Sequence, residues 1–299
     1  MANASGPNAT GGGASAQDGA NADASRPLRV GVVQLCSGVD RDASIAAAIT
    51  KIDEAAAGGA QFVATPEMTA SVDKNAKRLA AATPVGEAAD AFSEAARRHK
   101  IWLLIGSMVV KDAEGRLFNR ALMFSPDGET VARYDKVHMF DVDLPTGESW
   151  RESAVYTPGD QSVLIKTPTA SIGLTICYDV RFPQLYRALA QTGAEIMCVP
   201  AAFTKPTGAA HWETLLRARA IENGAFVIAP GQGGHHEDGR ETYGHSMIVD
   251  PWGKVVAMLE NDAPGILLAD IDLAKATEAR RRIPNLALER RVEVVTLPS

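Results

Sequence analysis

Three residues in the sequence combine a reactive side chain with a position where the chain is expected to change direction. Glu67 follows an apolar run, Cys177 follows another, and Lys136 stands in the segment YDKVHMFD, residues 134–141. In α/β folds, ligands gather at the carboxyl ends of strands. A cysteine at a strand end and beside a helix N-terminus is expected to have a lowered thiol pKa and to be exposed for attack. These side chains are therefore candidates for thiol-based nucleophilic chemistry.

Each of the three candidates also has an ordinary structural explanation. A lone cysteine after an apolar strand is commonly an inert core residue, and a glutamate after a proline is commonly a helix cap. A lysine beside an aspartate in a loop is usually a solvated charge. Cys36 and Cys198 lie within apolar runs, where the core explanation is the stronger one. Spacing alone does not bring the three candidates together.

The chain before Lys136 alternates apolar runs with segments of helical periodicity. Helical spacing predicts one helix between an N-cap at Asp42 and Gly58, and a second helix that carries Phe92 and His99 on one face. Two further strands flank the turn at residues 125–128. The remaining apolar runs are predicted as strands over residues 28–35, 61–65 and 101–110.

The same order of elements recurs after residue 170. Strands are predicted over residues 171–176, 195–199 and 225–229, helices near 182–189 and over 208–223, and a hairpin at 250–253. The segment VATPEM, residues 63–68, occupies the place in the first half that CVPAAF, residues 198–203, occupies in the second. Two such βαβαβ-hairpin halves, packed sheet on sheet, predict an α/β protein with a four-layer α-β-β-α sandwich.

The segments around the three candidates resemble the motifs of a known family. The string GLTICYDVRFPQLYRAL, residues 173–189, is similar to the nucleophile motif of the nitrilase, or carbon–nitrogen hydrolase, superfamily. TPEM at residues 65–68 resembles its glutamate motif, and YDKVHMFD resembles its lysine motif. The motifs occur in the family's order, and the similarity extends from about residue 28 to residue 282.

The resemblance is closest to the Nit branch, which includes the ω-amidases and the amidases that act on deaminated glutathione. The segments DVDLPTGESWRES, residues 141–153, and FTKPTGAAHWE, residues 203–213, resemble the deaminated-glutathione type. The resemblance implies the nitrilase-like four-layer fold.

The resemblance also implies a thiol mechanism that requires neither a metal nor a cofactor. Cys177 would attack an amide carbon and form a thioester, while Glu67 would accept the thiol proton and return it to the leaving group. Lys136 and the backbone N–H of Tyr178 would stabilise the oxyanion. These expectations concern residues that match the family's motifs one by one.

Two charged residues near these motifs are expected to support them. Glu152, in the segment WRES, matches the family's second glutamate and is expected to orient Lys136 or the substrate amide, although Glu148 lies nearby. Arg181, four residues beyond the cysteine, is expected either to hold a substrate carboxylate or to pair with Asp179.

Residues that follow a predicted strand end are expected to line the pocket: Phe203, Thr204 and Thr207. His235, His236 and His245 could suggest a metal site, but their spacing matches no strong zinc signature. The glycine-rich loop around these histidines is instead expected to be a surface turn or a pocket rim. No metal is predicted.

The composition is that of an ordinary globular protein of 299 residues. The formal net charge of −6 argues against a general attraction to nucleic acid or to anionic membranes. Three cysteines do not make a disulfide framework, which favours a cytoplasmic location. No run of eighteen apolar residues, such as a membrane span requires, occurs in the sequence.

Three segments are predicted along the chain. Residues 1–26 are predicted to be a disordered tail because they contain almost no residue able to form a core. Residues 27–282 are predicted to be the carbon–nitrogen hydrolase domain, and residues 283–299 an arm for packing or subunit contact. The resemblance implies a homodimer or a larger homo-oligomer.

The sequence therefore predicts an amidase that hydrolyses a linear carbon–nitrogen bond of a small carboxylate-bearing substrate. Deaminated glutathione and an α-keto ω-amide are the substrates that the resemblance favours. An N-carbamoyl amino acid amidohydrolase and a nitrilase are alternatives within the superfamily. A small-molecule binding module without turnover and a metal-dependent hydrolase built on the histidines are alternatives from other classes.

Overall fold

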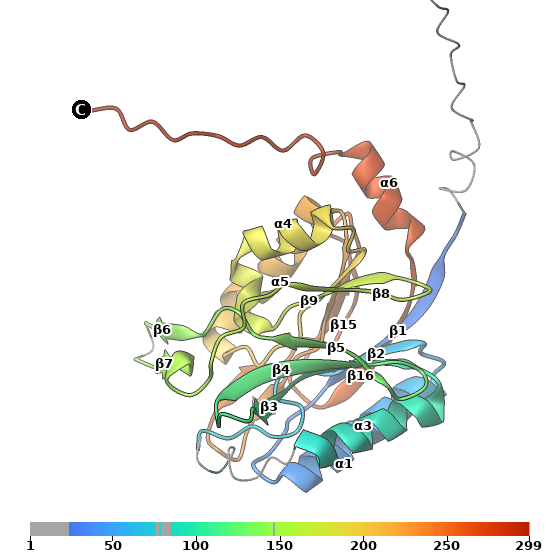
Figure 1. Cartoon of the computed structure of the whole chain (residues 1–299), viewed down its shortest axis with the longest axis vertical. Coiled ribbons are helices and arrows are strands. Elements are labelled where there is room, and N and C mark those ends of the chain that lie inside the picture. The colour runs from blue at the N-terminus through green and yellow to red at the C-terminus, as the bar shows by residue number, and fades with distance from the viewer. Residues whose placement is uncertain (1–23, 76–77, 79–84, 146, 299) are drawn as a thin grey trace, which may run out of the picture.

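Two six-stranded sheets packed face to face form the body of the protein (Figure 1). The computed structural model describes residues 24–75, 78, 85–145 and 147–298. Helices cover the outer face of each sheet, so the layers run helix, sheet, sheet, helix. The predicted four-layer sandwich is confirmed.

The first sheet has the strand order β16-β1-β2-β3-β4-β5. Its strands are β1 (Pro27–Gln34), β2 (Phe62–Ala64), β3 (Trp102–Lys111), β4 (Leu117–Phe124), β5 (Thr130–Asp135) and β16 (Gly265–Asp272). Strands β1, β2 and β3 run parallel, and the other neighbours pair antiparallel. Helices α1 (Arg41–Ala57) and α3 (Val85–His99) pack on its outer face.

The second sheet repeats this plan with the strand order β15-β14-β11-β10-β9-β8. Its strands are β8 (Val163–Lys166), β9 (Ser171–Leu174), β10 (Ile196–Cys198), β11 (Phe226–Ala229), β14 (Met247–Val249) and β15 (Val255–Met258). Strands β9, β10 and β11 run parallel. Helices α4 (Pro183–Gln191) and α5 (Lys205–Asn223) cover its outer face.

The last strand of each half of the chain lies at an edge of the sheet that the other half forms. Strand β8 comes after the first hairpin but pairs antiparallel with β9 of the second sheet. Strand β16 comes after the second hairpin but pairs along the whole length of β1 in the first sheet. The two predicted βαβαβ-hairpin halves are present, and this exchange of edge strands ties them together.

The alternation of side chains along the strands explains the sandwich. On β1, Leu28, Val30 and Val32 belong to the core between the two sheets, whereas Val33 belongs to the core under α1 and α3. Successive side chains of a strand point to opposite faces, so a strand that is apolar at every position requires cover on both sides. The apolar runs predicted as strands meet this condition.

Two helices begin at residues other than those predicted. Helix α1 has its N-cap at Asp40, whose carboxylate accepts a hydrogen bond from the N–H of Ala43, so Asp42 lies within the first turn and is not the cap. Helix α5 begins at Lys205 and not at residue 208, because Pro206 fits the first turn of a helix.

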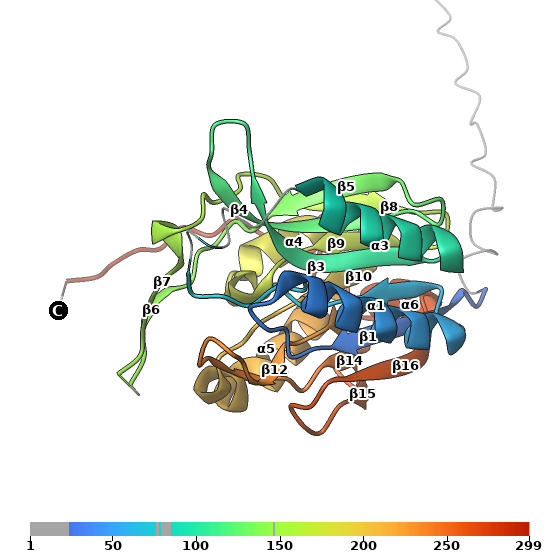
Figure 2. The same cartoon turned by 90° about the horizontal axis from the view of Figure 1, so that it is seen from below.

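Smaller elements lie between and after the sheets. They are the hairpin β6 (Asp141–Asp143) and β7 (Ser149–Arg151), the hairpin β12 (Gly233–His235) and β13 (Glu241–Tyr243), the short helices η1 (Glu152–Ala154) and η2 (Cys177–Arg181), and α6 (Ala274–Arg282). The β6–β7 hairpin projects from the body (Figure 2). Among the described residues, no helix has the length and apolarity needed to cross a membrane.

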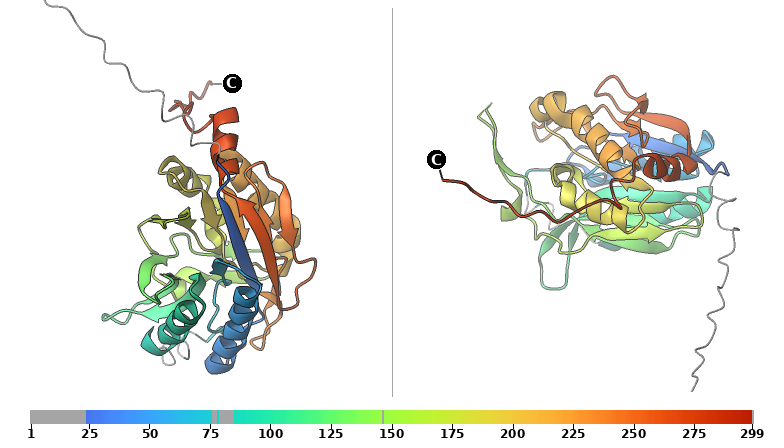
Figure 3. Two further views of the ribbon diagram at one scale, coloured as in Figure 1. Left: turned by 90° about the vertical axis from the view of Figure 1, so that its right-hand side faces the viewer. Right: turned by 90° about the horizontal axis from the view of Figure 1, so that it is seen from above.

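The last part of the chain leaves the body after α6 as an extended segment (Figure 3). Asn285 is tied to the body by a hydrogen bond to the carbonyl oxygen of Glu222, but Val292, Val294 and Leu297 are exposed. The extended segment corresponds to residues 283–298 of the arm that the sequence predicts over residues 283–299. Of the predicted N-terminal tail, residues 1–23 lie outside the described residues.

Candidate active site

Glu67, Lys136 and Cys177 meet at one edge of the sandwich, although they come from distant parts of the chain. Glu67 lies three residues after β2, Cys177 lies three residues after β9, and Lys136 directly follows β5. Both β2 and β9 are parallel strands, so the carboxyl ends of the two sheets converge here. All three residues are buried. The structure therefore brings together the three residues that the sequence selected.

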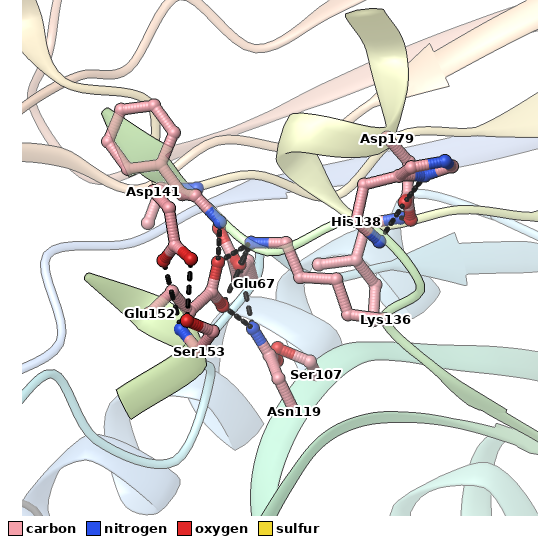
Figure 4. A network of polar contacts seen from close by, with 12 residues as sticks. Glu67, Ser107, Asn119, Lys136, His138, Asp141, Glu152, Ser153 and Asp179 are labelled. Atoms are coloured by element: carbon pink, nitrogen blue, oxygen red, sulfur yellow. Dashed lines mark hydrogen bonds and ion pairs between the residues drawn. The ribbon is translucent and has the colours of Figure 1, made fainter. Parts of the chain in front are cut away.

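The Lys136 ammonium lies between two carboxylates (Figure 4). Its Nζ is 2.9 Å from Oε1 of Glu67, and it is 3.0 Å and 2.8 Å from Oε1 and Oε2 of Glu152. An ammonium has three N–H groups, and three carboxylate oxygens are available to accept them. Burial opposes the charge of Lys136, but Glu152 and Glu67 outweigh this effect and hold its pKa well above the ordinary value.

Glu152, and not Glu148, reaches the lysine. The backbone N–H of Phe140 donates to Oε2 of Glu152 at 2.7 Å, which fixes the carboxylate against the chain after β5. Glu148 lies on the β6–β7 hairpin, where its carboxylate accepts a hydrogen bond from the indole of Trp150 at 3.4 Å. Of the two glutamates, Glu152 is the one that contacts Lys136.

Glu67 is held at both carboxylate oxygens. The backbone N–H of Ala202 donates to Oε2 at 2.8 Å, and the thiol of Cys177 also donates to this carboxylate. Burial disfavours the charged form, but the Lys136 charge and the hydrogen bonds from Lys136, Cys177 and Ala202 outweigh it, so the pKa of Glu67 lies below its ordinary value. Glu67 is an ionised carboxylate that contacts a thiol, which is the arrangement of a general base.

The expectation of a lowered thiol pKa at Cys177 is wrong. Burial, followed by the negative charge of Glu67, raises the pKa of the Cys177 thiol well above its ordinary value, and Lys136 offsets this only in part. The cysteine is also buried and not exposed, and the helix that it begins is a short 3-10 turn. At rest Cys177 is a protonated thiol, so a base must remove its proton at the moment of attack.

The backbone turns sharply at the cysteine. Cys177 has a φ of 48°, in the left-handed region that residues other than glycine seldom adopt. Met68, which follows the glutamate, has a φ of 57°. Such conformations concentrate at functional sites, where the surrounding structure maintains them. Here the carbonyl oxygen of Pro200 accepts the N–H of Cys177 at 2.9 Å.

Tyr178 presents a free backbone donor beside the thiol. Within the described part of the chain, its N–H makes no hydrogen bond. This N–H belongs to the residue directly after the cysteine, so it is available to a new acceptor near the thiol. The predicted backbone donor is therefore open.

Asp179 is a structural residue of the site that sequence reasoning did not assign. Its carboxylate accepts hydrogen bonds from the N–H of Ile176 at 2.8 Å, the hydroxyl of Tyr134 at 2.7 Å and the N–H of His138 at 3.0 Å. It thereby joins the turn that carries Cys177 to the chain that carries Lys136. Its place two residues after the cysteine was the only signal available.

Arg181 does not pair with Asp179, which was one of its two expected roles. Its guanidinium lies 5.9 Å from the ring centroid of Tyr178 and 5.3 Å from that of Phe203, and its Nη2 is 3.3 Å from Nδ1 of His211. The carboxylate of Asp179 is already occupied by the donors named above. Arg181 also lies outside the lining of the cavity described next.

A cavity of about 1110 Å³ opens onto Glu67, Lys136 and Cys177. Its lining includes all three residues predicted to form the pocket, Phe203, Thr204 and Thr207, together with Tyr178 and Glu152. It also includes four basic residues: Lys74, Arg151, Lys205 and Arg240. The cavity is at the upper end of the range for small-molecule sites, so it accommodates a substrate larger than a minimal amide.

The three histidines have separate partners. His236 is buried between the carbonyl oxygen of Ser37 and the hydroxyl of Thr242, and burial lowers its pKa. His235 is exposed and pairs with Glu241. His245 lies against the carbonyl oxygen of Tyr243. Among the described residues, no cluster of His, Cys, Asp or Glu could hold a metal ion.

The sequence profile of the carbon–nitrogen hydrolases matches residues 29–281. The chain belongs to the carbon–nitrogen hydrolase family. Within it, the chain lies in the Nit branch of the nitrilase superfamily. It is 39% identical over 266 residues to the deaminated glutathione amidase of Synechocystis sp., and the match covers 87% of this chain and 97% of that protein.

Solved structures of carbon–nitrogen hydrolases have the same fold. The NitFhit protein of C. elegans matches with a TM-score of 0.83 and 38% identity, over 89% of this chain and 66% of that longer chain. An amidase from Nesterenkonia sp. AN1 matches with a TM-score of 0.70 and 26% identity, over 86% of this chain and 95% of that one. That amidase carries the acetamide moiety of fluoroacetamide, covalently added at its active-site cysteine.

These similarities establish the class of enzyme. The chain is an amidase of the carbon–nitrogen hydrolase family, which acts on carbon–nitrogen bonds other than peptide bonds, and its substrate is a small-molecule amide.

Proposed function

We propose that this amidase hydrolyses the amide bond of a small carboxylate-bearing substrate through a thioester on Cys177. One observation carries the proposal: the Glu67 carboxylate accepts hydrogen bonds from both the Cys177 thiol and the Lys136 ammonium. All three residues line a cavity large enough for a substrate. Such an arrangement combines a nucleophile, a base and a fixed positive charge.

In the first half of the reaction, Glu67 takes the proton of Cys177 while the sulfur attacks the carbonyl carbon of the amide. The negative charge moves to the carbonyl oxygen, where the N–H of Tyr178 and the Lys136 ammonium stabilise it. To donate to this oxygen, Lys136 gives up one of its two contacts with Glu152. Collapse of the tetrahedral adduct breaks the carbon–nitrogen bond, and Glu67 returns the proton to the leaving amine.

In the second half, water replaces the amine. Glu67, now unprotonated again, accepts a proton from this water as its oxygen attacks the thioester carbon. The carbon–sulfur bond breaks, the sulfur regains a proton from Glu67, and the carboxylic acid leaves. The overall reaction adds one water and yields an acid and an amine or ammonia, with no redox step.

The favoured substrates are deaminated glutathione and an α-keto acid that carries an ω-amide. The relative in Synechocystis sp. is a deaminated glutathione amidase, and the cavity volume suits a substrate of that size. The basic side chains in the lining, Lys74, Lys205 and Arg240 among them, are proposed partners for substrate carboxylates. A substrate carboxylate would there compete with the ion pairs from Lys205 to Glu241 and Asp262 and from Arg240 to Asp238. Phe203, Thr204 and Thr207 are proposed to contact the substrate.

The wider organisation is proposed on similar grounds. Residues 27–282 are proposed as the catalytic domain, preceded by a tail and followed by the arm from residue 283. All three cysteines are free, which suits the reducing cytoplasm. A homodimer or larger assembly is supported by exposed apolar side chains: Ile221, Trp252 and Ile283.

The test is a substrate panel assayed with wild type, Cys177→Ala and the control Cys36→Ala. Cys36 follows β1 rather than lying within it, and it is partly exposed and absent from the cavity lining. The panel contains deaminated glutathione, α-ketoglutaramate, glutamine, an N-carbamoyl amino acid and a nitrile. For deaminated glutathione, α-ketoglutarate and Cys-Gly are measured, because no ammonia is released.

The proposal predicts turnover of deaminated glutathione or α-ketoglutaramate that Cys177→Ala loses by a factor of about 10⁴ or more and Cys36→Ala retains. Turnover that survives in Cys177→Ala would refute the thiol mechanism. Turnover confined to the carbamoyl compound or the nitrile would keep the mechanism and replace the substrate. Recovery of every compound unchanged would favour a binding role.

A further inference from the structure

Asn119 touches both carboxylates of the site and has no role in the mechanism above. Its Nδ2 lies 2.8 Å from Oε1 of Glu67 and 3.1 Å from Oε1 of Glu152 (Figure 4). We propose that Asn119 is a positioning residue that holds Glu67 and Glu152 on either side of Lys136. This inference rests on the proposed roles of Glu67 and Cys177 and deepens them.

The sheet places Asn119 where this role requires. Asn119 is the third residue of β4, and its carbonyl oxygen accepts the N–H of Lys136 at 3.0 Å. It is also paired with Val109 of β3, so it is held on both sides in the interior of the first sheet. Residues directly opposite on antiparallel strands project on the same face, so the amide and the ammonium approach the carboxylates together.

The orientation of the Asn119 amide leaves its side-chain oxygen without a hydrogen-bond partner in the described structure. The NH₂ group of Asn119 faces two carboxylate oxygens, which can only accept hydrogen bonds. The opposite orientation would place the amide oxygen against these oxygens. In the observed orientation Oδ1 of Asn119 is buried without a hydrogen-bond partner in the described structure. An unpaired buried acceptor destabilises a fold, so its presence at a catalytic site indicates a functional reason.

The charges of the site explain what the amide supplies. The buried carboxylate of Glu67 and the partly buried carboxylate of Glu152 surround one ammonium, so the lysine alone does not neutralise them. Additional donors must stabilise the second negative charge. The N–H groups of Ala202 and Phe140 each serve one carboxylate, whereas the Asn119 amide serves both. Without it, Glu67 and Glu152 would separate or one of them would become protonated.

The test follows the reactivity of Cys177 as well as turnover. The rate at which iodoacetamide alkylates Cys177 is measured between about pH 4 and pH 9, with the modified peptide identified by mass spectrometry. The titratable groups that face Glu67 are Lys136, Glu152, Cys177 and Tyr156. The acid limb of the profile, where the rate falls as the pH is lowered, is the readout of the Glu67 carboxylate and its surroundings.

In Asn119→Ala, the acid limb of both alkylation and turnover is expected to move up by about one pH unit or more, as loss of a charge-assisted hydrogen bond requires. In Asn119→Asp, which has nearly the same shape, the limb is expected to move further, because a third carboxylate replaces the donor. For a shift of one pH unit, rates at the foot of the acid limb should fall roughly 10-fold, and rates near neutrality should stay close to the wild-type values.

Asn223→Ala is the matched control. Asn223 is buried like Asn119, and its Oδ1 also has no partner in the described structure, but it lies at the end of α5 away from the cavity. A purely structural effect of removing a buried asparagine would therefore appear in both positions. The proposal would be overturned if the acid limb of both Asn119 variants lay at the wild-type pH. It would also be overturned if Asn223→Ala moved the acid limb as far as the Asn119 variants do.

Glu67→Gln separates this inference from the proposed function. Loss of the acid limb in Glu67→Gln verifies that Glu67 is the base, and an unmoved limb in the Asn119 variants then overturns the positioning role alone. A wild-type limb that persists in Glu67→Gln overturns the base and the positioning role together. Alkylation needs no substrate, so the test can be carried out even if the enzyme hydrolyses no compound of the substrate panel.

Discussion

At the scale of single residues, the site holds Cys177, the proposed nucleophile, as a neutral thiol. In many cysteine enzymes, a neighbouring histidine or a helix N-terminus lowers the pKa of the thiol, so that the thiolate is present before the substrate binds. Here burial, followed by the charge of the Glu67 carboxylate, raises the thiol pKa, and Lys136 compensates only in part. Proton transfer to Glu67 therefore has to accompany attack, and the thiol stays protected from unwanted oxidation between turnovers.

This arrangement predicts the pH dependence of kcat/KM. Activity requires ionised Glu67, whose pKa is lowered by Lys136 and its hydrogen bonds, so activity should be lost only as the pH falls below the ordinary glutamate range of roughly 4.3. The raised pKa values of Cys177 and Lys136 place the alkaline loss above the ordinary cysteine range of roughly 8.5. The value of kcat/KM should thus be constant between about pH 5 and pH 8. A change of kcat/KM with an apparent pKa near neutrality would contradict the roles proposed for Glu67 and Cys177.

A second prediction concerns Glu152. Glu152→Gln leaves a side chain of the same size but removes the charge that holds Lys136 at 2.8 Å. We expect kcat to fall roughly 10- to 100-fold, the effect of losing one charge-assisted hydrogen bond, with a smaller change in KM. Glu148→Gln, on the exposed hairpin, is the matched control and should leave kcat near the wild-type value. Equal effects of the two substitutions would show that Glu152 has no special part.

At the scale of elements, the approach of the Glu67 and Cys177 segments depends on Gly106 in β3. A Cβ atom there would lie 2.1 Å from the carbonyl oxygen of Thr65, 2.3 Å from Cβ of Pro200 and 2.5 Å from the carbonyl oxygen of Pro66. Pro66 precedes the glutamate, and the carbonyl oxygen of Pro200 holds the N–H of the cysteine. No side chain larger than hydrogen fits between the two segments.

Gly106→Ala should therefore displace both segments. We expect kcat/KM to fall about 100-fold, as for a displacement on the order of 1 Å, and unfolding to become easier by about 1–3 kcal/mol. The matched control is Gly86→Ala on α3, where a Cβ would meet nothing within 4 Å. That substitution should leave activity unchanged and keep or raise the melting temperature. Full activity of Gly106→Ala would mean that the segments adapt without cost.

The periodicity of apolar residues was sufficient to predict the parallel strands and the long helices. It also predicted both hairpins, because the turns at residues 125–128 and 250–253 carry strong local signals. It did not predict β8, a four-residue strand that pairs with the next strand, β9, or β16, whose partner β1 lies more than two hundred residues earlier in the sequence. The short strands β12 and β13 are rich in glycine and polar residues and give no periodic signal.

For the site, sequence motifs selected the residues but not their electrostatics. The motifs selected Glu67, Lys136 and Cys177, which the structure brings together. The thiol pKa was predicted with the wrong sign because it depends on burial and on a carboxylate from another strand, which local sequence does not show. Asn119 was overlooked for the same reason, since it faces the site only through its pairing with the chain at Lys136.

At the scale of the whole molecule, one face presents apolar side chains to solvent. Ile221 of α5, Trp252 of the β14–β15 turn and Ile283 after α6 are each more than half exposed, at 52%, 57% and 53%, and all three line one shallow hollow. Clustered exposure of large apolar residues is typical of protein contact surfaces, and tryptophan is prominent at their centres. This hollow is the proposed contact between copies of the chain.

The oligomer prediction follows from this hollow. Wild-type protein should sediment as a dimer or a larger assembly, and Trp252→Ser combined with Ile283→Ser should shift it toward the monomer by weakening association about 100-fold or more. Val131→Ser on β5, which removes an exposed apolar residue outside the hollow, is the control and should behave as wild type. Monomeric wild-type protein, or a double variant that stays associated, would refute the contact.

The exchange of edge strands has a consequence for how the protein is made. Ribosomes deliver the chain from its N-terminus, so Glu67, Lys136 and Cys177 all emerge before β16 exists. Until residues 265–272 are translated, β1 lacks its partner along its full length, and the first sheet carries an open edge. The nascent enzyme is therefore exposed to faulty strand pairing for most of its synthesis, and it becomes competent only when its last strand is released.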